Sequence, residues 1–151
     1  METQVTARSK QQSSYEFYKK LFKLTGAGGA AFWITDFVIS VSPIAAEYRA
    51  AFSISSLPMA LAEALVGGLM IGGCVSYFLL RFFDRIPTKN PILKALILSF
   101  VAMLMIEVLS TLVNPNNASV YLLIDTGMNT PRFFALGIVV GHLYKRLYRS
   151  A

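Results

Sequence analysis

Long apolar stretches constrain this chain more than any other feature of its sequence. Residues 57–80 and 91–113 are almost uninterrupted runs of apolar side chains, and residues 24–42 and 131–148 repeat the pattern with more polar interruptions. An α-helix rises about 1.5 Å per residue, so about 20 apolar residues cross the roughly 30 Å of bilayer hydrocarbon. The sequence therefore predicts an all-α integral membrane protein built as an antiparallel four-helix transmembrane bundle.

The composition agrees with this class of protein. Charged residues make up 15% of the chain, whereas a soluble domain usually carries roughly a quarter. The mean hydropathy is +0.55. Cys74 is the single cysteine, so no disulfide can form within the chain. A chain of 151 residues is expected to form one domain, and we assign residues 24–148 to it.

Two shorter segments precede the first span. Residues 1–14 are polar without periodicity, and we expect a disordered leader there. In residues 15–23 the aromatic side chains Tyr15, Tyr18 and Phe22 recur at helical spacing, with lysines among them. This pattern predicts a short amphipathic helix at the headgroup level of the membrane. The helix would serve either for recognition of the membrane surface or as an ordinary anchor.

Prolines mark where three of the spans begin. Pro58, Pro91 and Pro131 each lie one or two residues after a polar capping side chain, and in the first turn of a helix the missing N–H of proline costs nothing. Residues 118–129 are therefore expected to form a loop before the fourth span. An earlier start would place the polar side chains of this segment, Asp125 among them, in hydrocarbon.

The basic residues predict the orientation of the bundle. Of the 14 lysines and arginines, only Arg49 and Arg132 fall on one side; the others lie in the N-terminal segment, in the loop between the second and third spans or at its edge, and at the C-terminal end of the chain. Basic residues are enriched on the cytoplasmic side of membrane proteins. We expect both termini in the cytoplasm and a location in the inner or plasma membrane. The net charge of +6 then reflects topology, and no nucleic-acid partner is expected.

Three carboxylates lie inside the predicted spans. Asp36, Glu63 and Glu107 belong to the first, second and third span, and each lies about 8–9 Å from the outer end of its helix. An ionisable group at such a depth costs about 1–3 kcal/mol, so each needs a partner. Arg49 and Arg132, the basic residues on this side, are the expected ion-pair partners.

This carboxylate layer supports two main interpretations; a third is that the acids face lipid separately and extend toward the interface. In the first, Asp36, Glu63 and Glu107 form an ion or proton site, and the chain is a compact ion- or proton-coupled transporter. In the second, the arginines close salt bridges onto the layer, and the chain is a non-catalytic membrane subunit or scaffold that binds a larger membrane partner. The sequence contains no catalytic or cofactor-binding motif, so we expect neither enzymatic activity nor a cofactor. No histidine or cysteine lies at the level of the layer, so no metal site is expected.

Small residues predict where helices pack closely. The pairs Gly68 with Gly72 and Gly137 with Gly141 form GxxxG steps in the second and fourth spans. Such steps allow helix backbones to approach within a membrane. We expect the second span to pack against the fourth, and a seam between two copies of the chain is the alternative. The expected partners are thus the lipid bilayer together with a second copy or a larger membrane protein.

Overall fold

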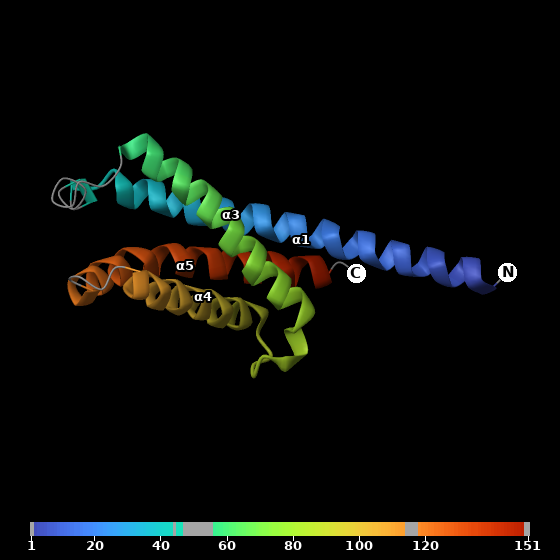
Figure 1. Cartoon of the computed structure of the whole chain (residues 1–151). Coiled ribbons are helices and arrows are strands. Elements are labelled where there is room, and N and C mark those ends of the chain that lie inside the picture. Colours follow the sequence, from blue (N-terminus) through green and yellow to red (C-terminus); the bar gives the residue numbers. More distant parts are fainter. Residues whose placement is uncertain (1, 44, 47–55, 114–117, 150–151) are drawn as a thin grey trace.

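The computed structural model describes residues 2–43, 45–46, 56–113 and 118–149. Figure 1 shows two helix pairs side by side, α1 with α3 and α4 with α5. The predicted all-α architecture with four long helices is confirmed for the described residues. These helices, together with a short 3-10 turn, are α1 (Glu2–Ser40), α3 (Leu57–Arg81), η1 (Phe83–Arg85), α4 (Pro91–Val113) and α5 (Ala118–Arg149).

The two central helices, α3 and α4, begin at the predicted places. Pro58 lies in the first turn of α3 and Pro91 is the first residue of α4. Asn90 caps α4, because its Oδ1 accepts a hydrogen bond of 3.0 Å from the backbone N–H of Ile92. Among the described residues, α3 and most of α4 are the two segments that are long and apolar enough to cross a membrane.

The N-terminal part of the chain differs from the prediction. Instead of a disordered leader over 1–14, a separate interfacial helix over 15–23 and a span, α1 is one helix from Glu2 to Ser40. Glutamine, lysine, arginine and alanine in the leader favour helix intrinsically. The helix therefore extends from the apolar span toward the N-terminus, into the polar leader. Figure 1 shows that α1 projects beyond the remainder of the bundle.

The start of the last helix is also different from the prediction. Residues 118–129, expected as a loop, belong to α5, which contains Pro131 in its interior. Pro131 cannot donate to the carbonyl of Gly127, and Thr130 Oγ1 donates a hydrogen bond of 2.7 Å to the carbonyl of Thr126 in the same turn. The prediction failed because it counted the polar side chains of this segment as exposed to hydrocarbon. In the structure Asn129 is buried and Asp125 is half-buried.

Glycines bring α1 and α3 together. A Cβ on Gly72 would lie 3.1 Å from the backbone N of Gly29 and the carbonyl O of Thr25, and a Cβ on Gly68 would lie 2.9 Å from Phe32. Further along the pair, Trp33 Nε1 donates a hydrogen bond of 2.9 Å to the carbonyl of Leu61. The first GxxxG step therefore packs against α1.

The second GxxxG step joins α5 to α4. A Cβ on Gly137 would lie 3.0 Å from Leu96 Cα, and a Cβ on Gly141 would overlap Ile92 Cα. The predicted packing of the second span against the fourth is thus wrong in its pairing. Each GxxxG step instead packs against the other helix of its own pair, where the absence of a Cβ lets the two backbones approach closely.

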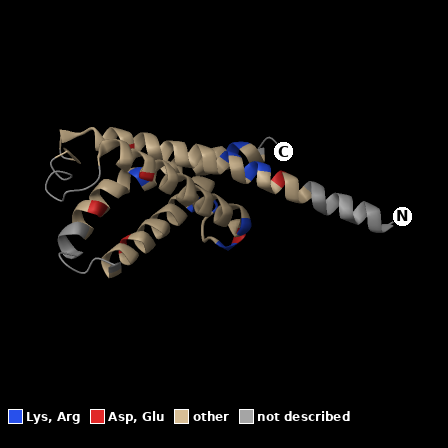
Figure 2. Ribbon diagram, turned by 45° about the horizontal axis from the view of Figure 1, so that its top comes forward, with Lys and Arg blue, Asp and Glu red and all other residues tan. Residues whose placement is uncertain are grey.

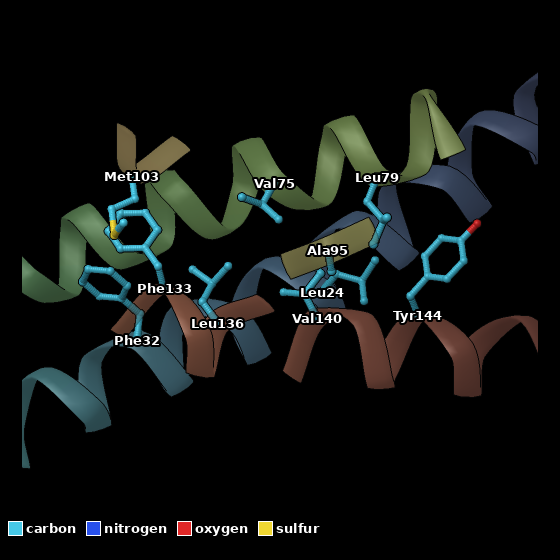
Figure 3. Packing of buried hydrophobic residues seen from close by; sticks show 10 residues of the cluster. All are labelled: Leu24, Phe32, Val75, Leu79, Ala95, Met103, Phe133, Leu136, Val140 and Tyr144. Atoms are coloured by element: carbon cyan, nitrogen blue, oxygen red, sulfur yellow. The ribbon is translucent and has the colours of Figure 1, made fainter. Parts of the chain in front are cut away.

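The core lies where the two pairs meet (Figure 3). Phe32 of α1 packs edge-to-face on Phe133 of α5, with ring centroids 5.4 Å apart, and Val75 and Leu79 of α3 are buried on the same cluster. Gly28 allows α1 to approach α5, since a Cβ there would clash with Val140. The interface between the pairs is therefore made by side chains, whereas each pair is held by backbone approach.

Candidate functional site

One face of α5 carries polar side chains into the bundle. Asp125, Asn129 and Arg132 are four and three residues apart in sequence, so they lie on one side of the helix. Asn129 is buried, with 8% of its surface exposed. Because α5 continues through Pro131, this face reaches the helices α1 and α4.

An ion pair connects α5 to α1. Arg132 Nη2 lies 2.6 Å from Asp36 Oδ1, and the two side chains are 13% and 5% exposed. Ser40, one turn after Asp36, donates a weaker hydrogen bond of 3.4 Å to Asp36 Oδ2. A close contact between a guanidinium and a carboxylate is among the stronger interactions in proteins. The charge of Asp36 is therefore neutralised within the bundle.

An amide extends this contact to α4. Arg132 Nη1 donates a hydrogen bond of 2.7 Å to Asn129 Oδ1, and Asn129 Nδ2 donates one of 2.9 Å to Glu107 Oε1. Glu107 is 3% exposed. The four side chains Asp36, Arg132, Asn129 and Glu107, here called the polar bridge, thus form one continuous connection across three helices.

The charges of the polar bridge are unequal. Arg132 is its one cation, against the two carboxylates of Asp36 and Glu107. Asp125, half-buried, also interacts electrostatically with Arg132. The Nε of Arg132 is buried without a hydrogen-bond partner among the described residues. Burial of a charge is costly unless the charge is paired, so Glu107, whose partner among the described residues is a neutral amide, is the least compensated member there.

The structure thus brings together part of the predicted layer. Asp36, Glu107 and Arg132 join in the polar bridge. Glu63 does not join it, because its side chain is exposed on the outside of α3. Arg49, the other expected ion-pair partner, lies outside the described residues.

Sequence reasoning missed the part played by Asn129. It treated Asn129 only as a polar obstacle to an early start of the last helix. The helical spacing of Asp125, Asn129 and Arg132 is the signal that could have indicated a polar face directed at the acids of other helices.

A second group of cations and aromatic rings lies at the opposite end of the bundle. Lys94 of α4 is 4% exposed. Its Nζ donates a hydrogen bond to the backbone carbonyl of Phe83 and lies 3.6 Å from the centroid of the Phe83 ring. Phe83 stacks on Tyr144 and Tyr144 on Tyr148, at 4.7 and 4.4 Å. Lys20 of α1 then lies 4.1 Å from the centroid of Tyr148. These five residues are called the lysine–aromatic stack.

Within the described part of the chain, no group of three or more His, Cys, Asp or Glu side chains is placed to hold a metal ion. Comparison of the chain with protein-family models, with curated proteins and with solved structures gives no match.

Proposed function

We propose that this chain is a four-span membrane protein that moves a proton or a cation across the membrane. The polar bridge is the site that the proton or cation occupies. Membrane insertion is supported by α3 and α4, whose apolar windows are only 22% and 28% buried. An apolar helix in the core of a soluble protein is mostly buried, and helices whose apolar surface faces outward need lipid or a partner to cover it.

The other two spans follow from packing. Residues 24–40 of α1 lie along α3, with contacts from Thr25 to Trp33, and the second half of α5 lies along α4. If α3 and α4 cross the bilayer, the segments beside them cross it too. The polar interruptions that weaken their hydropathy, Asp36 and Arg132, are paired with each other.

The proposed orientation places both termini in the cytoplasm. Lysines and arginines gather toward the end of the molecule where the C-terminus lies (Figure 2). Under the positive-inside rule this end faces the cytoplasm of a cell bounded by an inner or plasma membrane. The polar bridge then lies toward the outer side.

The observation that carries the transport proposal is the position of the polar bridge. It connects two helix pairs that are each rigidly held by glycine seams, and Glu107 within it faces a neutral amide. Neutralising Glu107 with a proton or a cation removes one of the two acidic charges of the polar bridge, the one that Arg132 reaches only through Asn129. The hydrogen bonds of Asn129 to Glu107 and to Arg132 respond to this change, so the contact between the pairs depends on the occupancy of Glu107.

The direct test is proton flux into sealed vesicles that contain the purified chain, measured with an enclosed pH-sensitive dye under an imposed pH gradient. We expect Glu107→Gln to lower the flux to that of protein-free vesicles. The same variant should fold at least as stably as the parent, because glutamine keeps the acceptor for Asn129 and removes a buried charge.

Glu63→Gln is the matched control, since Glu63 is an exposed carboxylate on α3 and does not contact the polar bridge. It should leave the flux unchanged. Equal flux in the parent and Glu107→Gln, or equal loss in the two variants, would contradict the proposal.

Exposure of Glu63 favours a second candidate function, that of a non-catalytic membrane subunit. Met59 and Val66, one turn to either side of Glu63, are also exposed, at 58% and 59%. A carboxylate on an apolar membrane-facing surface needs a partner that covers it. If this function is the correct one, Glu63→Gln will reduce co-purification of a larger membrane protein, and flux will be absent from the parent as well.

A further inference from the structure

A crevice opens where α1 runs past the end of α3. Its volume is about 300 Å³, at the lower end of the range of small-molecule sites. The residues that line it share hydroxyl, aromatic and guanidinium chemistry: Ser13, Ser14, Phe17, Tyr18, Tyr77 and Arg81. None of them is acidic, so every polar side chain of the crevice can donate a hydrogen bond to an anion.

The aromatic rings give the crevice a fixed wall. Phe17 lies edge-to-face with Tyr77 across the two helices, with centroids 6.2 Å apart, and edge-to-face with Tyr18 at 5.7 Å. Arg81 is the last residue of α3, and it is exposed. The guanidinium is therefore available to a ligand at the mouth of the crevice.

The position of the crevice relative to the membrane specifies the ligand, and this step depends on the proposed membrane insertion. The last residue of a spanning helix lies at the headgroup level. Below it on α3, the side chains of Phe78, Tyr77 and Met70 are 48%, 44% and 68% exposed. A molecule bound at Arg81 thus has an apolar surface beneath it that fits acyl chains.

We propose that this crevice binds the phosphate group of an anionic phospholipid. Arg81 binds the phosphate by charge-assisted hydrogen bonds, the hydroxyls of Ser13 and Ser14 donate to the headgroup, and the acyl chains follow the exposed face of α3. Basic sites at helix ends on the cytoplasmic side are typical of anionic lipid recognition.

The larger cavity at this end of the molecule is less suited to such a ligand. Its volume is about 510 Å³, and Asp84 lines it together with Lys145 and the lysine–aromatic stack residues Phe83, Tyr144 and Tyr148. The carboxylate of Asp84 repels a phosphate. The smaller crevice, without an acid in its lining, is therefore the better anion site.

The test measures lipid retention by the full-length chain in detergent micelles, with phosphatidylglycerol and phosphatidylcholine compared by native mass spectrometry at high salt. High salt screens diffuse attraction between lysines and lipid and leaves contacts inside the crevice. We expect phosphatidylglycerol to be preferred. Arg81→Gln should weaken its binding about tenfold or more, as the loss of a hydrogen bond to a charged group predicts.

Arg85→Gln is the matched control, because Arg85 is exposed at the same end of the molecule but lies over the Phe82 ring, outside the crevice. It should bind phosphatidylglycerol as the parent does. The double variant Ser13→Ala with Ser14→Ala changes exposed side chains beyond the end of α3, so it should fold normally and bind several-fold more weakly.

Two results would overturn the proposal. Equal losses in Arg81→Gln and Arg85→Gln would show diffuse charge attraction instead of a site. Displacement of the lipid by millimolar inorganic phosphate would show that the ligand of the crevice is a soluble phosphate compound and not a lipid. Vesicle flotation separates this proposal from the proposed function: a chain that does not float with lipid lacks the membrane insertion on which both depend, whereas a chain that floats without lipid preference lacks only the site.

Discussion

The two ends of the bundle bury charge in different ways. At one end, the polar bridge pairs Asp36 with Arg132 and reaches Glu107 through Asn129, so opposite charges and an amide meet at fixed distances. At the other end, Lys94 is as deeply buried, yet its partners among the described residues are the carbonyl and the ring face of Phe83. A guanidinium–carboxylate contact is strongly directional, whereas attraction to a ring face tolerates many positions of the ammonium.

This difference separates two tasks within one fold. The polar bridge connects the helix pairs through specific contacts, and removal of either Asp36 or Arg132 leaves the other charged and buried. The lysine–aromatic stack also connects the pairs, through Lys20 of α1 on Tyr148 of α5. It does so near the end of the bundle, where lysine side chains can reach water. We therefore expect the first end to be sensitive to loss of one partner of its ion pair and the second to tolerate loss of a buried cation.

The largest expected effect is that of Arg132→Gln. This change leaves Asp36 buried without a cation, and breaking a buried pair in this way costs about 3–5 kcal/mol. The free energy of unfolding, measured by denaturant titration in mixed micelles, should fall by this amount.

The double variant Asp36→Asn with Arg132→Gln is the control for this prediction. It removes both charges and should recover most of the loss, because no uncompensated ion remains. A double variant as unstable as Arg132→Gln alone would show that packing, and not charge, makes the first end sensitive.

Gly141→Ala is expected to have the next largest effect. It tests whether the second end is stabilised by close packing of the α5 and α4 backbones. The added Cβ would overlap Ile92 Cα and lie 2.9 Å from the carbonyl O of Pro91, both backbone atoms that cannot rotate away. We expect a loss of about 1–3 kcal/mol, as for other overpacked sites.

Gly67→Ala is the matched control for Gly141→Ala. A Cβ there meets nothing within 4 Å, so the same substitution should be neutral or stabilise α3 by up to about 1 kcal/mol through helix propensity. If both variants lost equal stability, backbone approach at Gly141 would not be what holds the pair.

The sequence predicted the elements whose boundaries are decided locally. α3 and α4 begin at the prolines and end where apolar residues end, because helix starts and hydropathy depend on neighbouring residues. The starts of α1 and α5 were missed. In α1, intrinsic helix preference extends the helix into a polar segment, and in α5, Asn129 is stabilised by Glu107 of another helix.

The site shows the same limit. The depth of Asp36 and Glu107 follows from counting residues along each helix, and the sequence could therefore place them at one level. Which side of the helix a carboxylate occupies depends on crossing and rotation of the helices, and these follow from the glycine seams. For this reason the outward direction of Glu63 could not be predicted.

Lys94→Met has the smallest expected effect and tests the tolerance of the second end directly. Methionine has a similar length and fills the buried position, while the carbonyl of Phe83 loses one donor and the ring loses its cation. Because a carbonyl close to the membrane surface can bond to water, and an aromatic face needs no partner, we expect a loss of about 1 kcal/mol. Denaturant titration of this variant beside Arg132→Gln gives the measurement. A loss as large as that of Arg132→Gln would mean that Lys94 neutralises a buried acid as Arg132 does, and the contrast between the two ends would then fail.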